Sequence, residues 1–357
     1  MNIGFDAKRY FHNNTGLGNY SRDLVNALCR QFPEHHYFLF DKHPDHTSLP
    51  ENAQAITPGG NSILWRSRGI VSDITKQNLD LFHGLSNELP YGKLPANIQK
   101  VVTIHDVIFR HFPKHYKFTD RFIYHRKTTH AATIADKIIA TSKATAADLM
   151  EYYGIAENKL HVVYQTCGPL HWHEYSDQTV NTFRKEKQLE YRFILYVSSF
   201  QQRKNHLQLL KALNDCSDKN IYLVLAGRKG ETYESCVEYI ASHKLQNRVT
   251  LLTDLGAKEL PLLYRSAQSF IYPSMTEGFG IPLLEAACAG LPMAVNDIPV
   301  FREILPSQGL LFDIRQHASL TEILPVLYKH NKQDYSNYLK NFTPESGATQ
   351  TMAVYKG

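Results

Sequence analysis

Several features that would place this chain in a membrane or an oxidising compartment are missing from its 357 residues. No uninterrupted apolar run approaches the roughly 20 residues that a membrane-spanning helix needs. The N-terminus, MNIGFDAKRYF, lacks a long apolar core followed by a small-residue cleavage site, so it does not resemble a signal peptide. The five cysteines form no CxxC pair, which argues against a disulfide framework and a cysteine zinc site. These absences favour a cytoplasmic protein.

The bulk composition is that of an ordinary globular protein. Apolar residues make up 43% of the chain and charged residues 20%, which argues against disorder over most of its length. The formal net charge of +5 is modest and is compatible with nucleic acid, an anionic membrane or phosphorylated ligands, so it decides none of these. A chain of this length exceeds what one hydrophobic core usually serves, and we therefore expect two domains.

Short apolar, β-branched runs alternate with longer helical patterns, which predicts two α/β halves with parallel sheets. The predicted strands are 2–6, 37–40, 81–83, 101–105, 137–140, 161–163, 193–198, 221–226, 249–252, 269–272 and 292–295. One predicted helix begins near Gly18, and the others cover 143–153, 205–213, 231–244, 258–267 and 282–289. Ser142 is the expected cap of the helix 143–153, and Gly154 is expected to end it. Polar and aromatic residues without periodicity place a linker at 173–190, between domains 1–172 and 191–341. Ligands of such sheets bind at the carboxyl ends of the strands, so two facing halves would enclose a cleft.

The segment 273–285, PSMTEGFGIPLLE, carries most of the functional signal. It follows a predicted strand, contains two glycines that let backbone amides approach a ligand, and opens a helix whose first turn holds Pro282. Free amides and the helix dipole at that position favour a phosphate. Glu277 and Glu285 flank this loop, and each carboxylate can accept hydrogen bonds from a vicinal diol of a sugar or a ribose. The alternative is that both glutamates are solvated charges that serve the helix dipole.

Three further positions are candidates for binding or catalysis. Arg203 and Lys204 open a helix after a predicted strand and can clamp a diphosphate, although a solvated basic pair would look the same. The segment 14–18 holds Gly16 and Gly18 around Leu17 after the first strand, a pattern that is also typical of a tight turn. His105, at the end of a central strand in the first half, can reach a sugar hydroxyl or simply bond the structure around it. Its neighbour Asp106 suits a local capping role.

The stretch 109–127 interleaves basic and aromatic residues. It holds six Lys or Arg against one acid, Asp120, and Phe112, Tyr116, Phe118, Phe122 and Tyr124 interleave with them. Such a stretch suits anionic lipid head groups. It equally suits a solvated basic face whose aromatic side chains turn inward.

The segment EGFGIPLLEA, with Glu277 and Glu285 eight positions apart, resembles the signature of retaining glycosyltransferases of family 4 (group 1), which have the GT-B fold. The resemblance covers nearly the whole chain, including the Arg-Lys-Asn segment 203–205, VVTIHDVIF around His105, and Phe82-His83-Gly84. It implies two Rossmann-like domains across a deep cleft, with a last helix at 342–357 packing back on the first domain. This chain has Ser198-Ser199 where some members carry an Arg, and Thr15 where most carry the first of two glycines.

The resemblance also implies a role for each candidate residue. Glu277, with the segment 278–281 (Gly278, Phe279, Gly280, Ile281), would bind the transferred sugar, and Glu285 would bind the ribose. Gly16, Leu17, Gly18, Arg203 and Lys204 would bind the donor phosphates, while His105 and Glu277 would be the catalytic pair. His83 fits the family pattern as a structural or acceptor-side residue.

The expected activity is retaining transfer of a hexose, mannose or similar, from a GDP- or UDP-sugar to a glycan or lipid-linked acceptor in surface polysaccharide synthesis. No metal or other cofactor is expected, because the Asp-x-Asp pattern of metal-dependent transferases is missing and Arg203 and Lys204 can offset the leaving-group charge. Nucleic acid is not an expected partner, and peripheral contact with the inner face of a membrane would use residues 109–127. Two rival interpretations are a sugar-nucleotide epimerase and a non-catalytic carbohydrate-binding relative.

Overall fold

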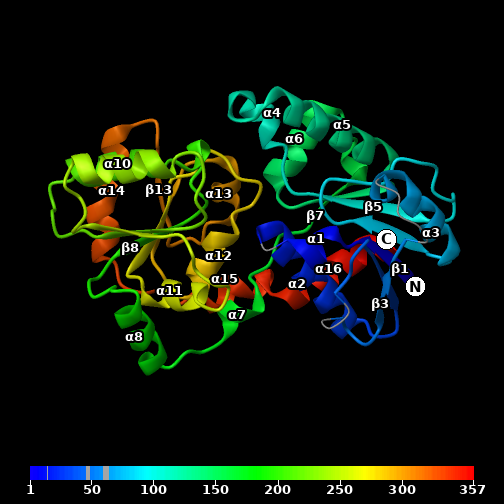
Figure 1. Ribbon diagram of the computed structural model, residues 1–357, viewed down its shortest axis with the longest axis horizontal. Coiled ribbons are helices and arrows are strands. Elements are labelled where there is room, and N and C mark those ends of the chain that lie inside the picture. The colour runs from blue at the N-terminus through cyan, green and yellow to red at the C-terminus, as the bar shows by residue number, and fades with distance from the viewer. Residues whose placement is uncertain (14, 46–48, 59–63) are drawn as a thin grey trace. The chain divides into compact units, whose positions relative to one another are not determined.

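The structure, a computed structural model, describes residues 1–13, 15–45, 49–58 and 64–357 (Figure 1). The chain forms two compact units. Unit 1 combines residues 1–168 with the C-terminal segment 341–357, and unit 2 comprises residues 169–340. In the part of the chain that is described, no helix has the length and apolar character needed to cross a bilayer.

Unit 1 is built on a seven-stranded parallel sheet in the order β3-β2-β1-β4-β5-β6-β7. The strands are β1 (Asn2–Asp6), β2 (His36–Phe40), β3 (Ala53–Ile56), β4 (Leu81–Gly84), β5 (Gln99–Ile104), β6 (Lys137–Ala140) and β7 (Leu160–Val162). The strand order reverses direction between β1 and β4. In an open α/β sheet such a switch point is where ligands bind, beside the carboxyl ends of the strands.

Helices cover both faces of this sheet. They are α1 (Lys8–His12), α2 (Gly16–Gln31), α3 (Ile70–Lys76), α4 (Ile108–His111), α5 (Phe118–Ile134), α6 (Lys143–Tyr153) and α16 (Pro344–Lys356). Consecutive strand residues point to opposite faces, so Val101 packs in the core beneath α2 and α16, and Val102 in the core beneath α3, α5 and α6. Burial on both faces explains why the central strands carry apolar residues at consecutive positions, as in Val101 and Val102.

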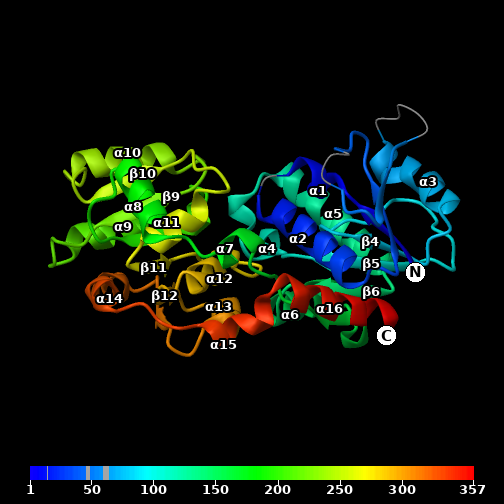
Figure 2. The same ribbon diagram turned by 90° about the horizontal axis from the view of Figure 1, so that it is seen from below.

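The C-terminal helix α16 belongs to unit 1, as the sequence predicts. Thr343 caps it by accepting a hydrogen bond from the Ser346 amide at 3.0 Å. Ala348 and Met352 are buried in the same core as α2, and both views show the red helix beside the blue one (Figures 1 and 2). The Tyr355 hydroxyl lies 2.6 Å from His83 Nδ1. The end of the chain is therefore tied directly to strand β4.

Unit 2 contains a six-stranded parallel sheet in the order β10-β9-β8-β11-β12-β13. Its strands are β8 (Ile194–Val197), β9 (Leu223–Ala226), β10 (Val249–Leu252), β11 (Ser269–Tyr272), β12 (Met293–Asn296) and β13 (Leu310–Phe312). Its helices are α7 (Pro169–Trp172), α8 (Asp177–Glu186), α9 (His206–Asp215), α10 (Tyr233–Ser242), α11 (Leu260–Ser266), α12 (Ile281–Cys288), α13 (Pro299–Ile304), α14 (His317–Lys329) and α15 (Ser336–Leu339). Here the switch point lies between β8 and β11.

Several predictions made from the sequence are confirmed in detail, and one is wrong. Helix α6 has the predicted bounds, Ser142 Oγ accepts from the Thr145 amide at 3.0 Å, and Gly154 ends it with φ 62°. The predicted irregular linker 173–190 instead contains α8, whose Arg184 donates to the Ser266 carbonyl at 2.6 Å. Of the residues of α8, all of which are described, Phe183 alone is buried. Val180 and Phe183 are the only apolar residues of α8, and this small apolar content is why the helix was not recognised in the sequence.

Candidate active site

The switch point of unit 2 brings two predicted loops together. The first loop follows β8 and ends in a 3₁₀ turn at Gln202–Lys204, and the second follows β11 and leads into α12. Since β8 and β11 are neighbouring parallel strands, their carboxyl ends lie at the same edge of the sheet. The Met275 amide donates to the Arg203 carbonyl at 2.9 Å, so the loops are joined through their backbones.

Arg203, Lys204 and Glu277 meet between these loops. The Lys204 ammonium is hydrogen-bonded to Glu277 Oε1, and Arg203 Nη1 lies 3.5 Å from Glu277 Oε2. Arg203 also donates to the Thr276 carbonyl at 3.1 Å. The side chains of Lys204 and Glu277 are only 8% and 10% exposed. Two cations and one carboxylate thus share a nearly buried position where an open α/β sheet binds ligands.

The protonation state of this cluster follows from its neighbours. Burial raises the pKa of Glu277, but the charges of Lys204 and Arg203 outweigh it, so the pKa lies below its ordinary value. Glu277 is therefore ionised at neutral pH. Its single negative charge leaves a net positive charge on the three side chains, which favours an anionic ligand.

Residues without a predicted role hold the basic pair in place. Asn205 has φ 58° and donates through Nδ2 to the Pro273 carbonyl at 2.8 Å. Tyr196, on β8, donates its hydroxyl to the Lys204 carbonyl at 2.8 Å. Asn205 adjoins the basic pair, and its position could have been recognised from the sequence because Asn tolerates a left-handed conformation. Tyr196 carries no comparable signal in the sequence.

The glycine loop has the strand–loop–helix form predicted for it. Gly280 precedes α12 with φ 117°, and a Cβ there would lie 2.9 Å from the Phe301 ring. Phe279 is buried, and Pro282 occupies the first turn of the helix. The roles of the segment 278–281 in binding the sugar remain predictions.

Glu285 lies in α12 with partners of its own. The Tyr264 hydroxyl of α11 donates to Glu285 Oε2 at 2.7 Å, and His171 Nε2 lies 3.4 Å from Oε1. Burial lowers the pKa of His171, although the Glu285 charge opposes this. The carboxylate is thus held in one orientation by residues far from it in the sequence, and for this reason neither partner was predicted. Its role toward a ribose remains a prediction.

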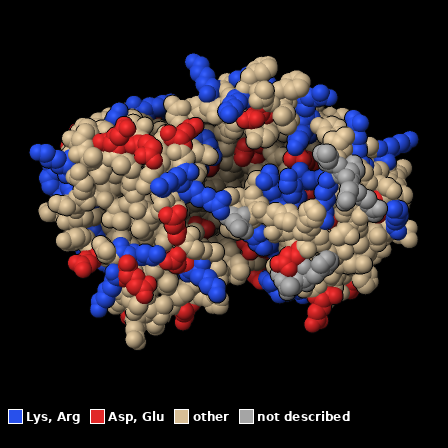
Figure 3. Space-filling model, viewed as in Figure 1, with Lys and Arg blue, Asp and Glu red and all other residues tan. Residues whose placement is uncertain are grey.

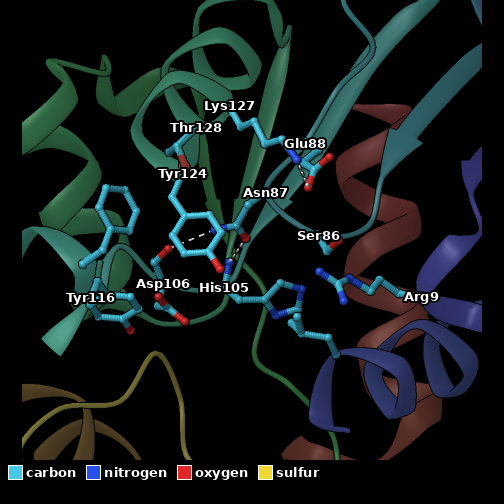
Figure 4. A pocket seen from close by; sticks show the side chains of 12 residues that line it. Arg9, Ser86, Asn87, Glu88, His105, Asp106, Tyr116, Tyr124, Lys127 and Thr128 are labelled. Carbon is cyan, nitrogen blue, oxygen red and sulfur yellow. Dashed lines mark hydrogen bonds and ion pairs between the residues drawn. The ribbon is translucent and has the colours of Figure 1, made fainter. Parts of the chain in front are cut away.

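The switch point of unit 1 carries a cavity of about 240 Å³ (Figure 4). Among the predicted residues, Leu17, His105 and Asp106 line it. Helix α1 and the loop after β4 add lining residues that were not predicted, including Arg9, Ser86, Asn87 and Glu88, and α5 contributes Tyr124 and Lys127 from the basic and aromatic stretch 109–127. The unit therefore gathers side chains at the carboxyl ends of β1, β4 and β5, as the fold dictates.

His105 has both ring nitrogens bonded within the protein. Nε2 lies 2.9 Å from the Leu85 carbonyl, which only accepts, so Nε2 carries the proton and Nδ1 accepts from Gln165 at 2.7 Å. Burial, helped by the Arg9 charge, lowers the pKa of His105. The ring is neutral and fixed in orientation by these bonds. Its predicted catalytic role remains a prediction.

Neighbouring predicted residues have clear structural constraints. Gly16, Leu17 and Gly18 form the first turn of α2, and a Cβ on Gly18 would lie 1.7 Å from the Asn13 carbonyl oxygen. Asn14, the first residue of that segment, lies outside the described residues. Asp106 accepts from the Ile108 amide at 3.2 Å, the local role expected of it. The roles of Gly16, Leu17 and Gly18 toward donor phosphates remain predictions.

His83 is a structural residue. It is fully buried, and its ring nitrogens bond the Tyr355 hydroxyl at 2.6 Å and Thr103 Oγ1 at 2.8 Å. Burial, with a smaller contribution from His105, lowers the pKa of His83 to about 3. Of the two roles considered for His83, structural or acceptor-side, this geometry favours the structural one.

The aromatic residues of α5 are exposed. Phe118 is 74% exposed and Phe122 53%, and Ile123 and Tyr124 are nearly half exposed. The guanidinium of Arg121 lies over Phe118 and that of Arg126 over Phe122. In Figure 3, Lys and Arg side chains project among uncharged atoms over α4 and α5. The interpretation with inward-turned aromatics is therefore wrong for these residues of α5.

Comparison with known proteins adds independent information. Residues 14–166 match the family model described as Glycosyltransferase Family 4, and residues 177–342 match Glycosyl transferases group 1. The chain belongs to the family 4, group 1, glycosyltransferases. The first match contains residues 16–18 and His105, and the second contains Arg203, Lys204, Glu277 and Glu285. The glycosyltransferase thus carries every predicted site residue inside a matched region.

Named relatives and solved structures agree with this assignment. The glycosyltransferase is 24% identical to O-antigen chain mannosyltransferase B of Escherichia coli, over 96% of each chain. It is 27% identical to O-antigen chain mannosyltransferase RfbU of Salmonella typhimurium, over 61% of this chain and 57% of that protein. The structure of Anabaena Alr3699/HepE in complex with UDP and glucose gives a TM-score of 0.74 at 17% identity, over 100% of this chain and 99% of the other. A glycosyltransferase from Rickettsia africae gives 0.74 at 17%, over 99% and 97%. The GT-B fold, with two Rossmann-like units and a helical C-terminus, is confirmed.

Proposed function

We propose that this glycosyltransferase moves mannose from a nucleotide-diphosphate sugar to a glycan or lipid-linked saccharide during surface polysaccharide synthesis. The named relatives that support the sugar and the process are O-antigen mannosyltransferases. GDP-mannose is the donor we test first. A UDP-sugar is the alternative, because the Anabaena structure holds UDP and glucose.

The observation that carries the proposal is the cluster of Arg203, Lys204 and Glu277 at the switch point of unit 2. The two cations bind the diphosphate of the donor by charge-assisted hydrogen bonds, together with backbone amides of the loop before α12. Glu277, held ionised beside them, accepts hydrogen bonds from hydroxyls of the transferred sugar. Glu285, oriented by Tyr264, binds the ribose.

The reaction proceeds with retention and without a metal ion. The bond between the anomeric carbon and the diphosphate oxygen breaks, and the acceptor oxygen bonds that carbon on the same face. The acceptor proton passes to an oxygen of the departing diphosphate. Arg203 and Lys204 offset the charge that develops on the leaving group, the task a divalent cation performs elsewhere. His105 is a neutral ring in the wall of the unit 1 cavity, and it reaches the acceptor hydroxyl only by exchanging its Nδ1 bond to Gln165 for one to the acceptor.

A donor screen tests this proposal. Titration calorimetry in EDTA with GDP, UDP and their sugars should show binding of GDP-mannose, and NMR of the product should show the donor's anomeric configuration. Failure of all donors to bind would indicate a non-catalytic relative. Conversion of the donor sugar without transfer to any acceptor would indicate an epimerase.

We also propose peripheral contact with an anionic membrane through residues 109–127. Phe118 and Phe122 are exposed beside Arg121 and Arg126, and a groove of about 390 Å³ between α4 and α5 is lined by Arg110, Arg121 and both phenylalanines. Exposed aromatic rings next to cations suit the interface of an anionic bilayer.

Vesicle sedimentation tests the membrane contact. The enzyme should bind phosphatidylglycerol vesicles but not phosphatidylcholine vesicles, and Phe118→Ser with Phe122→Ser should reduce binding about tenfold. Leu311→Ser with Val326→Ser removes two exposed apolar residues from unit 2 and serves as the control. Equal binding of both vesicle types, or equal loss in the control, would refute the contact.

A further inference from the structure

The cavity of unit 1 contains a cation that the fold does not use. Four charged side chains line the cavity: Arg9, Glu88, Asp106 and Lys127. Lys127 Nζ lies 3.1 Å from Glu88 Oε1, and Glu88 Oε2 lies 3.0 Å from Arg66 Nη1. Asp106 accepts from the Ile108 amide. Three of the four charged side chains are therefore engaged by protein groups.

Arg9 differs from these three. Within residues 1–13, 15–45, 49–58 and 64–357, its guanidinium has no ion pair or hydrogen bond, and its Nε is buried without an acceptor. Arg22, packed against the same short helix, shows what a structural arginine does here: it donates to the Tyr10 and Asn13 carbonyls and to Asn19. Buried donors in native proteins are paired in the great majority of cases, and because Arg9 lies in the wall of a cavity, a group that enters the cavity can pair with its guanidinium.

The position of Arg9 aims it at the cavity. Helix α1 begins directly after β1, at the switch point, and Figure 4 shows the guanidinium pointing toward the His105 ring, across from Tyr116 and Tyr124. The Arg9 charge is close enough to lower the pKa of His105, after the larger effect of burial. A ligand that enters this cavity therefore meets the planar guanidinium of Arg9 on one side and the rings of Tyr116 and Tyr124 on the other.

The space suits a small group as the part of the ligand that is seated inside it. A volume of about 240 Å³ corresponds to roughly eight water molecules at about 30 Å³ each, which suits one sugar ring with a substituent. The arginine fork matches the geometry of two oxygens of a carboxylate or phosphate. An uncharged sugar would leave the guanidinium without a counter-charge.

We infer that Arg9 recognises a negatively charged acceptor: a saccharide whose terminal unit carries a carboxylate or a phosphate seated in the unit 1 cavity. The inference rests on the proposed function, since it names the acceptor class of that reaction. The donor diphosphate is the other source of anionic oxygens for Arg9, and the test separates the two.

The test uses the full-length enzyme and small probes: glucuronate and inorganic phosphate, with glucose as the uncharged control and GDP as the donor probe. Saturation-transfer NMR and calorimetry should show glucuronate or phosphate binding at least tenfold tighter than glucose. Arg9→Gln should weaken that binding at least tenfold and leave GDP binding unchanged. Lys8→Gln removes an exposed charge from the same helix and should change neither.

The outcomes distinguish the sources of the anion. Loss of GDP affinity in Arg9→Gln, with anion binding unchanged, would assign Arg9 to the donor and overturn the inference. Equal anion binding in Arg9→Gln and the native enzyme would also overturn it. If neither GDP nor UDP binds the native enzyme, the proposed function fails, and the dependence of anion binding on Arg9 still decides the inference.

A measurement on the native enzyme covers the case in which Arg9→Gln does not fold. Phenylglyoxal modifies accessible arginines, and peptide mass spectrometry reads the extent at each residue. Glucuronate or phosphate should slow modification of Arg9 several-fold, while glucose should not. Modification at the same rate with and without the anions would contradict the inference.

Discussion

The two units use one sheet design and place polar side chains at the same topological position, yet their switch points are chemically different. In unit 2, Glu277 lies against Lys204 and Arg203, and the carboxylate and both cations fill the position between the loops. In unit 1, the same position is a cavity with Arg9 in its wall and a neutral His105 beside it. A shared backbone thus supports two kinds of site, because the loops that follow the strands determine the chemistry.

The difference suggests a division of labour. A concentrated positive site suits the diphosphate, which all donors of this class share. A cavity with aromatic and hydrogen-bonding walls suits an acceptor, which differs from enzyme to enzyme. Changes at Arg203, Lys204 or Glu277 should therefore affect the donor, and a change at Arg9 should affect the acceptor.

The largest expected effect comes from unit 2. Glu277→Gln keeps the shape and hydrogen-bonding capacity of the side chain but removes the charge between Lys204 and Arg203. We expect kcat/KM to fall about 10²- to 10³-fold, the usual loss when one transition-state contact is removed. Steady-state kinetics with both substrates would show it, with acceptor KM unchanged.

The matched control for that variant is Glu234→Gln, an exposed glutamate of α10 in the same unit. It should retain native kinetics, and circular dichroism should show that both variants are folded. Native turnover in the Glu277→Gln enzyme would show that Glu277 is not part of the site, and the contrast drawn between the two units would fail.

A smaller effect should appear in stability as the pH falls, and it should affect both units. Burial, the largest cause in each case, lowers the pKa of His83 in unit 1 and of His206 in unit 2 from 6.5 to about 3. The unfolded chain binds a proton at each near pH 6.5, whereas the folded protein does not until about pH 3. Stability is therefore fully present above pH 6.5 and falls below it, by about 2 kcal/mol per histidine between pH 7 and 5.

Urea unfolding at pH 7 and 5 measures that loss. His206→Phe keeps a ring between Phe200 and Tyr196 and should remove the contribution of unit 2, leaving a shallower pH dependence. An identical pH dependence in the variant would show that the histidine titrates normally in the folded protein.

The smallest effect tests how Glu285 is held. Tyr264→Phe deletes the hydroxyl that donates to Glu285 Oε2. We expect donor affinity to fall about 5- to 10-fold, roughly 1 kcal/mol, with kcat unchanged, since one hydrogen bond to a charged group is lost. Because the proposed target is the ribose, the preference for GDP over 2′-deoxy-GDP should also shrink, which calorimetry can measure.

Tyr335→Phe is the control for that experiment. Tyr335 is buried in the same unit, and in the described part of the chain its hydroxyl has no hydrogen-bond partner. It should alter neither donor affinity nor the preference for the ribonucleotide. If the two variants behave alike, Tyr264 only fills space, and Glu285 needs no orienting partner.

Local patterns predicted much of the secondary structure of both units. The alternation of apolar runs located eleven of the strands within a few residues, and the capping signals of α6 were read correctly. Strands β3 and β13 were not predicted, since each is short and half-exposed and so lacks the apolar run of a buried strand. The meeting of Arg203 and Glu277 followed from the parallel order of their strands.

Other parts of the site could not be read from the sequence. Tyr264 and His171 reach Glu285 from segments 21 and 114 positions earlier in the chain, and no local pattern marks either. Arg9 became a candidate only when the structure showed a guanidinium without a protein partner beside a cavity. Such residues are defined by packing between distant segments, which a single sequence does not encode in any local pattern.

The central claim is that side-chain cations of unit 2, rather than a divalent metal, hold the diphosphate of the donor. Calorimetric titration of GDP into the native enzyme and into the Arg203→Met, Lys204→Met variant, both in EDTA, tests it most directly, with Lys211→Met as the exposed-charge control. We predict binding to the native and control proteins and at least a 100-fold loss in the double variant. Native affinity in the double variant, or binding that appears only when a divalent cation is added, would contradict the claim.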